Sequence, residues 1–177
     1  MMRRLPALWL ASCLPAVLPA LNASAVEMSV RKAGLWEMKI VRTGSPLPEM
    51  TMQHCTDEAI DRDMNTGRAP AARDVCSKRD IERTATGYVS DSACIVGGAS
   101  ITSHSDITGD FNSAYTVKSV SHTEGGPAAL SRDATTTIEA KWLGACEPGQ
   151  KPGDIMMPGG FKLNIKDAEM LKGLAPK

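Results

Sequence analysis

The chain has 177 residues, with 20 basic and 20 acidic side chains, 15 glycines, 11 prolines and 5 cysteines. This length and this balanced charge fit one globular domain, and they exclude the strongly basic surface that nucleic-acid binding requires. Aromatic residues make up only 4% of the chain, so large rings contribute little to its core.

Residues 1–25 have the pattern of a secretory signal peptide. Arg3 and Arg4 give a positive start, an apolar stretch follows over residues 5–21, and Ala23-Ser24-Ala25 offers the small side chains that the peptidase requires. We therefore expect cleavage between Ala25 and Val26, and a mature protein in the periplasm.

Two alternatives remain open at this end of the chain. A retained membrane anchor is disfavoured because prolines interrupt the apolar stretch, which barely reaches the roughly 20 residues of a spanning helix. Lipidation of Cys13 is suggested by Leu10-Ala11-Ser12-Cys13, which resembles a lipoprotein processing box, although apolar residues continue past this cysteine. No later apolar run is long enough to span a bilayer, so we expect no transmembrane anchor after processing.

Seven later segments have the residue patterns of short β-strands. In the first of them, Trp36, Met38 and Ile40 alternate with charged residues, which indicates one buried face and one solvated face. The Gly97-Gly98 pair predicts a tight hairpin. The expected strands are residues 34–43, 50–55, 78–84, 88–96, 99–107, 111–120 and 134–143.

One short helix is expected after the second strand. Thr56 is the candidate N-cap, and the two acidic residues that follow it suit the positive end of the helix dipole. Ile60 and Met64 lie one turn apart and form an apolar stripe. The helix is expected to end near Gly67, and residues 68–74 to form a loop.

Together these elements predict a mainly β fold. Short strands bounded by glycine and proline, with a single helix among them, are typical of an antiparallel meander that forms a sandwich or a partly closed barrel. Residues 26–177 are expected to form a single disulfide-stabilised β domain. Its last part, residues 146–177, is a turn-rich tail in which residues 164–174 have a weak helical pattern.

Cleavage after Ala25 leaves four cysteines in a chain sent to an oxidising compartment, which predicts two disulfides. Three connectivities are possible. Position along the chain favours Cys55 with Cys76, which flank the helix and its loop, and Cys94 with Cys146, which each end a strand-like run. No two of these cysteines have the close spacing of a zinc site.

The histidines of the chain are His54, His104 and His122. A nucleophilic triad needs a histidine beside a carboxylate and a hydroxyl or thiol. The segment Ser103-His104-Ser105-Asp106 contains these groups, but neighbouring strand residues point to opposite faces, so His104 can share a face only with Asp106. A hydrolase is therefore a less favoured interpretation, and no catalytic residue is assigned.

Copper is a second candidate chemistry. Met50, Met52 and His54 share one strand face, and thioether and imidazole ligands suit this metal. Methionine also fills cores that contain few aromatic residues, so packing is the favoured role, and no cofactor is expected. The acidic pairs Asp61/Asp63 and Asp80/Glu82 are interpreted as solvated faces.

The large aromatic residues could instead line a cavity for a small hydrophobic ligand, since small closed sheets can hold one such molecule. With so few rings in the chain, we expect most of them to be used in packing. These residues are Trp36, Tyr88, Phe111, Tyr115, Trp142 and Phe161.

Three pieces of the sequence resemble a family of secreted proteobacterial proteins, the domain-of-unknown-function family 3617. The resemblance covers most of residues 33–160 and implies a periplasmic, disulfide-bonded, mostly β protein, without implying an activity or any site residue. The pieces are Gly34-Leu35-Trp36-Glu37, Gln53-His54-Cys55-Thr56-Asp57-Glu58, and Leu143-Gly144-Ala145-Cys146 followed by Lys151-Pro152-Gly153-Asp154.

The sequence therefore predicts a non-catalytic binding or envelope-associated module. A carrier of a small hydrophobic ligand or of copper is the alternative. The expected partners are a small hydrophobic ligand or an envelope protein, and not nucleic acid.

Overall fold

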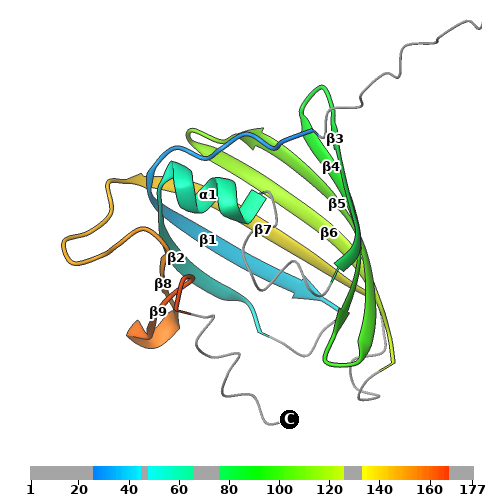
Figure 1. The fold of residues 1–177 in the computed structure, drawn as a ribbon. Coiled ribbons are helices and arrows are strands. Elements are labelled where there is room, and N and C mark those ends of the chain that lie inside the picture. Colours follow the sequence, from blue (N-terminus) through cyan, green and yellow to red (C-terminus); the bar gives the residue numbers. More distant parts are fainter. Residues whose placement is uncertain (1–25, 45–47, 66–75, 126–132, 168–177) are drawn as a thin grey trace, which may run out of the picture.

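The computed structural model describes residues 26–44, 48–65, 76–125 and 133–167 (Figure 1). The predictions for the signal peptide, Cys13, the loop at residues 68–74 and the last part of the weak helical pattern lie outside these ranges. The strands are β1 (Gly34–Thr43), β2 (Met50–Thr56), β3 (Cys76–Arg83), β4 (Gly87–Val96), β5 (Ala99–Asp110), β6 (Ala114–Glu124), β7 (Asp133–Gly144), β8 (Asp154–Met156) and β9 (Lys162–Asn164). The helices are α1 (Glu58–Asn65) and a short 3-10 helix, η2 (Pro158–Gly160).

The described strands form one antiparallel sheet in the order β3-β4-β5-β6-β7-β1-β2-β8-β9. Strands β3 to β7 follow one another as a meander, and β1 then pairs with β7 and brings β2 beside it. The sheet bends around α1, which lies on the inside of the curve (Figure 1). Because β3 and β9 are the two edges, the sheet is a single open layer. The predicted mainly β meander, with a helix after the second strand and a turn-rich tail, is confirmed.

The face of the sheet that α1 covers, called the inner face below, is set by the alternation in β1. Trp36 and Ile40 are buried on it, whereas Lys39 on the opposite face is exposed. Cross-strand partners point to the same side of a sheet. The register of β1 with β2 and β7 therefore places His54, opposite Trp36, and Ile138, opposite Ile40, on the inner face as well.

A chain of aromatic rings forms part of the core on the inner face. The ring centroids of Trp36 and Tyr115 are 5.5 Å apart, those of Tyr115 and Phe111 are 5.2 Å apart, and those of Phe111 and Tyr88 are 5.8 Å apart. These four rings are used in packing, as the sequence predicts. Phe161 is 66% exposed.

Two local predictions have different outcomes. The hairpin at Gly97 and Gly98 is confirmed, and both residues have positive φ, at 57° and 82°, as a tight turn of this kind requires. The predicted N-cap Thr56 is wrong. That residue ends β2, while the Asp57 carboxylate accepts the backbone N–H of Ile60 at 2.8 Å and caps α1.

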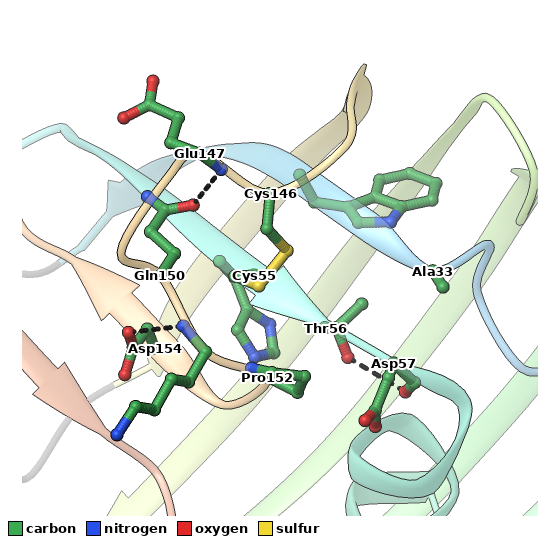
Figure 2. The surroundings of a disulfide bond; sticks show 12 residues. Ala33, Cys55, Thr56, Asp57, Cys146, Glu147, Gln150, Pro152 and Asp154 are labelled. Carbon is green, nitrogen blue, oxygen red and sulfur yellow. Dashed lines mark hydrogen bonds between the residues drawn. A yellow bond between two sulfur atoms is a disulfide. The ribbon is translucent and has the colours of Figure 1, made fainter.

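The predicted disulfide pairing is also wrong. Cys55 is bonded to Cys146 (Figure 2), and Cys76 is bonded to Cys94. Cys76 lies directly opposite Cys94 in the β3–β4 ladder, with a Cα–Cα distance of 3.8 Å. Leu35 of β1 lies opposite Cys55 of β2 on one side and opposite Gly144 of β7 on the other. Cys146 follows Gly144 by two residues, so the chain after β7 brings it close to Cys55.

The tail is tied to the sheet next to the Cys55–Cys146 disulfide. The backbone N–H of Gly153 donates to the Cys55 carbonyl at 2.8 Å, and β8 extends the sheet from the edge of β2. Asp154 is buried and accepts the backbone N–H of Lys151 at 2.8 Å (Figure 2). No helix in the described part of the chain is long and apolar enough to cross a membrane.

Candidate ligand-binding groove and the buried cluster beside it

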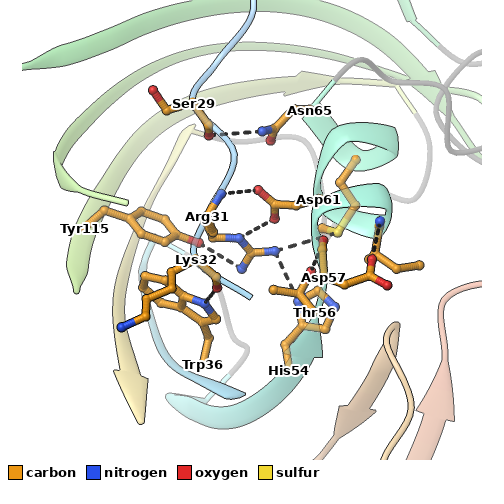
Figure 3. A network of polar contacts seen from close by, with 12 residues as sticks. Ser29, Arg31, Lys32, Trp36, His54, Thr56, Asp57, Asp61, Asn65 and Tyr115 are labelled. Atoms are coloured by element: carbon orange, nitrogen blue, oxygen red, sulfur yellow. Dashed lines mark hydrogen bonds and ion pairs between the residues drawn. The ribbon is translucent and has the colours of Figure 1, made fainter. Parts of the chain in front are cut away.

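Four polar side chains from different segments meet under α1, and we call them the buried cluster (Figure 3). Arg31 comes from the segment before β1, His54 from β2, Asp61 from α1 and Tyr115 from β6. Arg31 is 7% exposed, and both Asp61 and His54 are 1% exposed. Charged and polar groups of this kind are seldom so buried unless they are paired.

Arg31 is the centre of the buried cluster. Its backbone N–H donates to Asp61 Oδ2 at 2.6 Å, and its Nε forms an ion pair with Asp61 Oδ1. The two terminal nitrogens of the guanidinium lie 3.3 Å from the Tyr115 hydroxyl and 3.3 Å from His54 Nδ1. Removing either member of the ion pair would leave the other charge buried and uncompensated, which typically costs about 3–5 kcal/mol.

His54 is neutral in this environment. A guanidinium can only donate hydrogen bonds, so His54 Nδ1 accepts one and the ring proton sits on Nε2. Burial, and then the adjacent positive charge of Arg31, lower the pKa of His54 to about 4. Nε2 is buried and finds no hydrogen-bond partner among the described residues.

Tyr115 is also held in its neutral form, because burial raises the pKa of its hydroxyl. With His54 neutral and Tyr115 protonated, the charge of the buried cluster comes from Arg31 and Asp61. The buried cluster therefore has a structural role. It attaches the chain before β1 to α1 and to the strands β2 and β6.

Further contacts hold the same segment. The backbone N–H and the hydroxyl of Ser29 each lie 2.9 Å from the Tyr88 hydroxyl, and Asn65 at the end of α1 donates to the Ser29 carbonyl at 3.3 Å. Tyr88 in turn accepts a hydrogen bond from Arg83 of β3 at 3.0 Å. The segment of residues 26–33 is thus fixed on one side by α1 and on the other by the β3–β4 edge.

A groove of about 490 Å³ lies between this segment, the end of α1 and the edge strand β3. Its apolar lining comes from Val26, Met28 and Val30 of the segment and from Ile81 of β3, with charged residues such as Arg79 around them. Val30 precedes Arg31 in the chain, and Arg62, which also lines the groove, follows Asp61. The buried ion pair therefore fixes two walls of the groove.

The three copper candidates predicted from the sequence share one strand face but differ in their surroundings. Met50, Met52 and His54 all lie on the inner face of β2, where their register partners are Ile40, Met38 and Trp36. The two methionines are half-buried, whereas His54 belongs to the buried cluster and contacts Arg31. The imidazole Nδ1 is therefore occupied by Arg31.

The histidine predicted for a triad lies on the outer face of the sheet. His104 Nδ1 is 2.8 Å from Asp91 Oδ1 on the neighbouring strand, and this hydrogen bond raises the pKa of His104. The hydroxyls of Ser103 and Ser105 contact serines of the adjacent strands on the inner face. His104 therefore lies beside a carboxylate without either neighbouring serine.

His122 is likewise exposed and contacts two carboxylates, Asp133 at 2.6 Å and Glu124 at 3.1 Å, which raise its pKa. No group of three or more histidine, cysteine, aspartate and glutamate side chains within the described ranges is placed to hold a metal ion.

The ion pair of the buried cluster is the feature that sequence reasoning missed. The interpretation of Asp61 as part of a solvated face is wrong, because it is buried against Arg31, whereas Asp63, Asp80 and Glu82 are exposed. Asp61 follows Ile60, which also packs inward, but an acidic residue on a short helix is usually solvated. Arg31 lies 30 residues away in the chain, so no local pattern connects the two.

Comparison with known proteins identifies a family for this chain. The model of a family described as a protein of unknown function, DUF3617, matches residues 31–146. This range begins at Arg31 and ends at Cys146, so it contains the buried cluster and both disulfides. No curated protein and no solved structure matches the chain.

Proposed function

The chain belongs to the DUF3617 family, and we propose that it is a secreted, non-catalytic envelope protein that binds a small hydrophobic ligand in the groove beside α1. The observation that carries this proposal is the groove itself. Its volume of about 490 Å³ lies within the roughly 300–1,000 Å³ typical of small-molecule sites.

The composition of the walls supports a hydrophobic ligand with a polar end. Three of the apolar lining side chains come from residues 26–30, and Ile81 faces them from the inner face of β3. Arg62 and Arg79 lie at the same groove together with carboxylates such as Glu82. A ligand with an apolar body can contact the first set while its polar end remains near the charged groups.

Two further observations support a location in the cell envelope. Disulfides persist in oxidising compartments, and the described chain contains two of them. Residues 1–25 have the charged, apolar and small-residue order of an export signal. Both are expected of a protein that folds in the periplasm.

The first test of this proposal is ligand retention. Protein purified from the periplasm and examined by native mass spectrometry should carry a small molecule that is released under denaturing conditions. The same measurement reports the site of cleavage and the presence of two disulfides. A ligand-free mass from protein that binds no apolar probe would contradict the proposal.

The second test places the ligand in the groove. Ile81→Asp puts a charge on the apolar wall and should weaken binding of the fluorescent probe 1-anilinonaphthalene-8-sulfonate at least tenfold, because the buried apolar contact is lost. Ile95→Asp is the control, since Ile95 is 64% exposed near the β4–β5 hairpin and does not line the groove. Equal probe affinity in the two variants would place the binding site elsewhere.

A further inference from the structure

Three methionines come together on the inner face of the sheet, although they belong to two strands. Met38 of β1 lies directly opposite Met52 of β2, and Met50, opposite Ile40, is two residues before Met52. Directly opposed residues have Cβ atoms about 4.5–5.5 Å apart, and alternate residues of one strand lie about 7 Å apart on the same face. The flexible thioethers can therefore converge on one point.

We propose that Met38, Met50 and Met52 form a thioether site for Cu(I). This ligand set replaces the set expected from the sequence. His54 is excluded because it is 1% exposed and its Nδ1 is occupied by Arg31, while Met38 is added by the pairing of β1 with β2.

The three methionines are less buried than the inner-face residues of β1 on either side of Met38. On the same face, Trp36 and Ile40 are buried, whereas Met38, Met50 and Met52 are all half-buried. This part of the inner face lies along β1 and β2, beyond the buried cluster.

The surroundings favour a soft monovalent ion over a hard divalent one. Thioethers are neutral, polarizable ligands that select Cu(I), while divalent ions such as Mg²⁺ and Ca²⁺ prefer carboxylate and carbonyl oxygens. The neighbours of the three methionines across the sheet are apolar, Ala140 opposite Met38 and Ile138 opposite Ile40. Arg42, on the same face of β1 and opposite Thr136, adds positive charge that disfavours divalent cations.

The competing explanation is that methionine merely fills space. Methionine does pack into irregular gaps, and leucine has nearly the same volume. Replacing methionine by leucine therefore removes the sulfur ligand while it preserves packing. A site that depends on sulfur loses Cu(I) after this exchange, whereas a packing role leaves the protein unchanged.

The experiment is an anaerobic titration of the disulfide-bonded protein with Cu(I), in ascorbate and in competition with the chromogenic chelator bicinchoninate. We expect one Cu(I) per chain, bound with submicromolar affinity. Zn²⁺ at the same concentration should not bind at this site. Binding no tighter than micromolar would overturn the proposal.

Variants in which single methionines are replaced show which residues bind the Cu(I) ion. Met38→Leu and Met52→Leu should each weaken Cu(I) binding at least tenfold, and the triple variant that also contains Met50→Leu should abolish it. Met156→Leu is the matched control, because Met156 is half-buried on β8, opposite Gln53 on the other face of the sheet. Unchanged affinity in the triple variant, or an equal loss in the control, would overturn the assignment.

A second readout does not depend on variants. In the wild-type protein, Cu(I) should shift the ε-methyl NMR resonances of Met38, Met50 and Met52 and leave those of Met28 and Met156 in place. Shifts confined to other methionines would contradict the site. Ile81→Asp should leave Cu(I) binding unchanged, so failure of the groove proposal and failure of this one can be told apart.

Discussion

Arg31 and Asp61 hold together two segments that are far apart in the sequence. Arg31 lies just before β1, and Asp61 lies in the middle of α1, so their ion pair attaches the start of the family-matched region to the helix. Both side chains are almost fully buried, which makes solvent screening weak. This ion pair, together with the Asn65–Ser29 hydrogen bond, therefore sets the position of one groove wall relative to the other.

His54 gives the buried cluster a predictable response to acid. Its pKa is about 4 in the folded protein and 6.5 when unperturbed, so the unfolded chain binds the proton more readily. The contribution of His54 to the free energy of unfolding is constant above pH 6.5. This free energy decreases as the pH falls from 6.5 towards 4, because the unfolded chain then takes up a proton that the folded protein does not. The loss amounts to about 3 kcal/mol when the pH reaches the lower value.

The variant His54→Asn isolates this effect, because its amide oxygen can still accept a hydrogen bond from Arg31 while the side chain does not titrate. Urea unfolding at pH 7 and at pH 4.5 should show a smaller acid-induced loss in the variant than in the wild type. His104 and His122 act in the opposite direction, since their pKa values are raised, but they are present in both proteins. An identical loss in both would show that His54 is not the responsible group.

At the scale of secondary structure, β1 is the strand that joins the β3–β7 meander to the β2 side of the described sheet. It pairs with β2 on one side and with β7 on the other, and its first residue, Gly34, lies where β7 ends. Gly34 has φ of 131°, and a Cβ atom there would come within 2.1 Å of the Gly144 carbonyl oxygen. A side chain at this position would force the two strands apart.

Gly34→Ala should therefore destabilise the protein by more than Gly144→Ala. Both glycines have positive φ, so both variants incur backbone strain of about 1–3 kcal/mol. A Cβ on Gly144 would meet no atom within 4 Å, however, and only the Gly34 variant adds a steric clash. Urea unfolding midpoints compare the two, and a Gly144→Ala variant as unstable as Gly34→Ala would count against the close approach.

At the scale of the whole molecule, one disulfide is local and the other joins segments that are far apart in the sequence. Cys76 and Cys94 join neighbouring strands of one hairpin, 18 residues apart in sequence. Cys55 and Cys146 are 91 residues apart and link the second strand to the chain after β7 (Figure 2). On chain-entropy grounds the first loop contributes about 3 kcal/mol and the second about 4.6 kcal/mol.

Removal of the long-range disulfide should thus cost more than removal of the local one. We expect Cys55→Ala/Cys146→Ala to lower the free energy of unfolding by at least 1 kcal/mol more than Cys76→Ala/Cys94→Ala. The burial of Cys55 adds to the difference, because its replacement leaves a cavity. Urea unfolding of both double variants under non-reducing conditions measures this, and a larger loss in the local pair would contradict it.

Local patterns along the chain were sufficient to predict the strands β1 to β7, the hairpin at Gly97-Gly98, the short helix and the turn-rich tail, but not the short strands β8 and β9 within that tail. Each of these depends on neighbouring residues: alternation sets the buried face of β1, and paired glycines allow the positive φ of a tight turn. The number of cysteines available for pairing followed from composition in the same way.

Contacts between distant segments were decided only by folding. The insertion of β1 between β2 and β7 brings Cys55 near Cys146, sets Met38 opposite Met52, and overrides the pairing suggested by position along the chain. Arg31 and Asp61 meet because α1 packs across the inner face of the curved sheet (Figure 3). Such pairs have no signature in either local sequence, since burial of each charge is favourable only once the other has arrived.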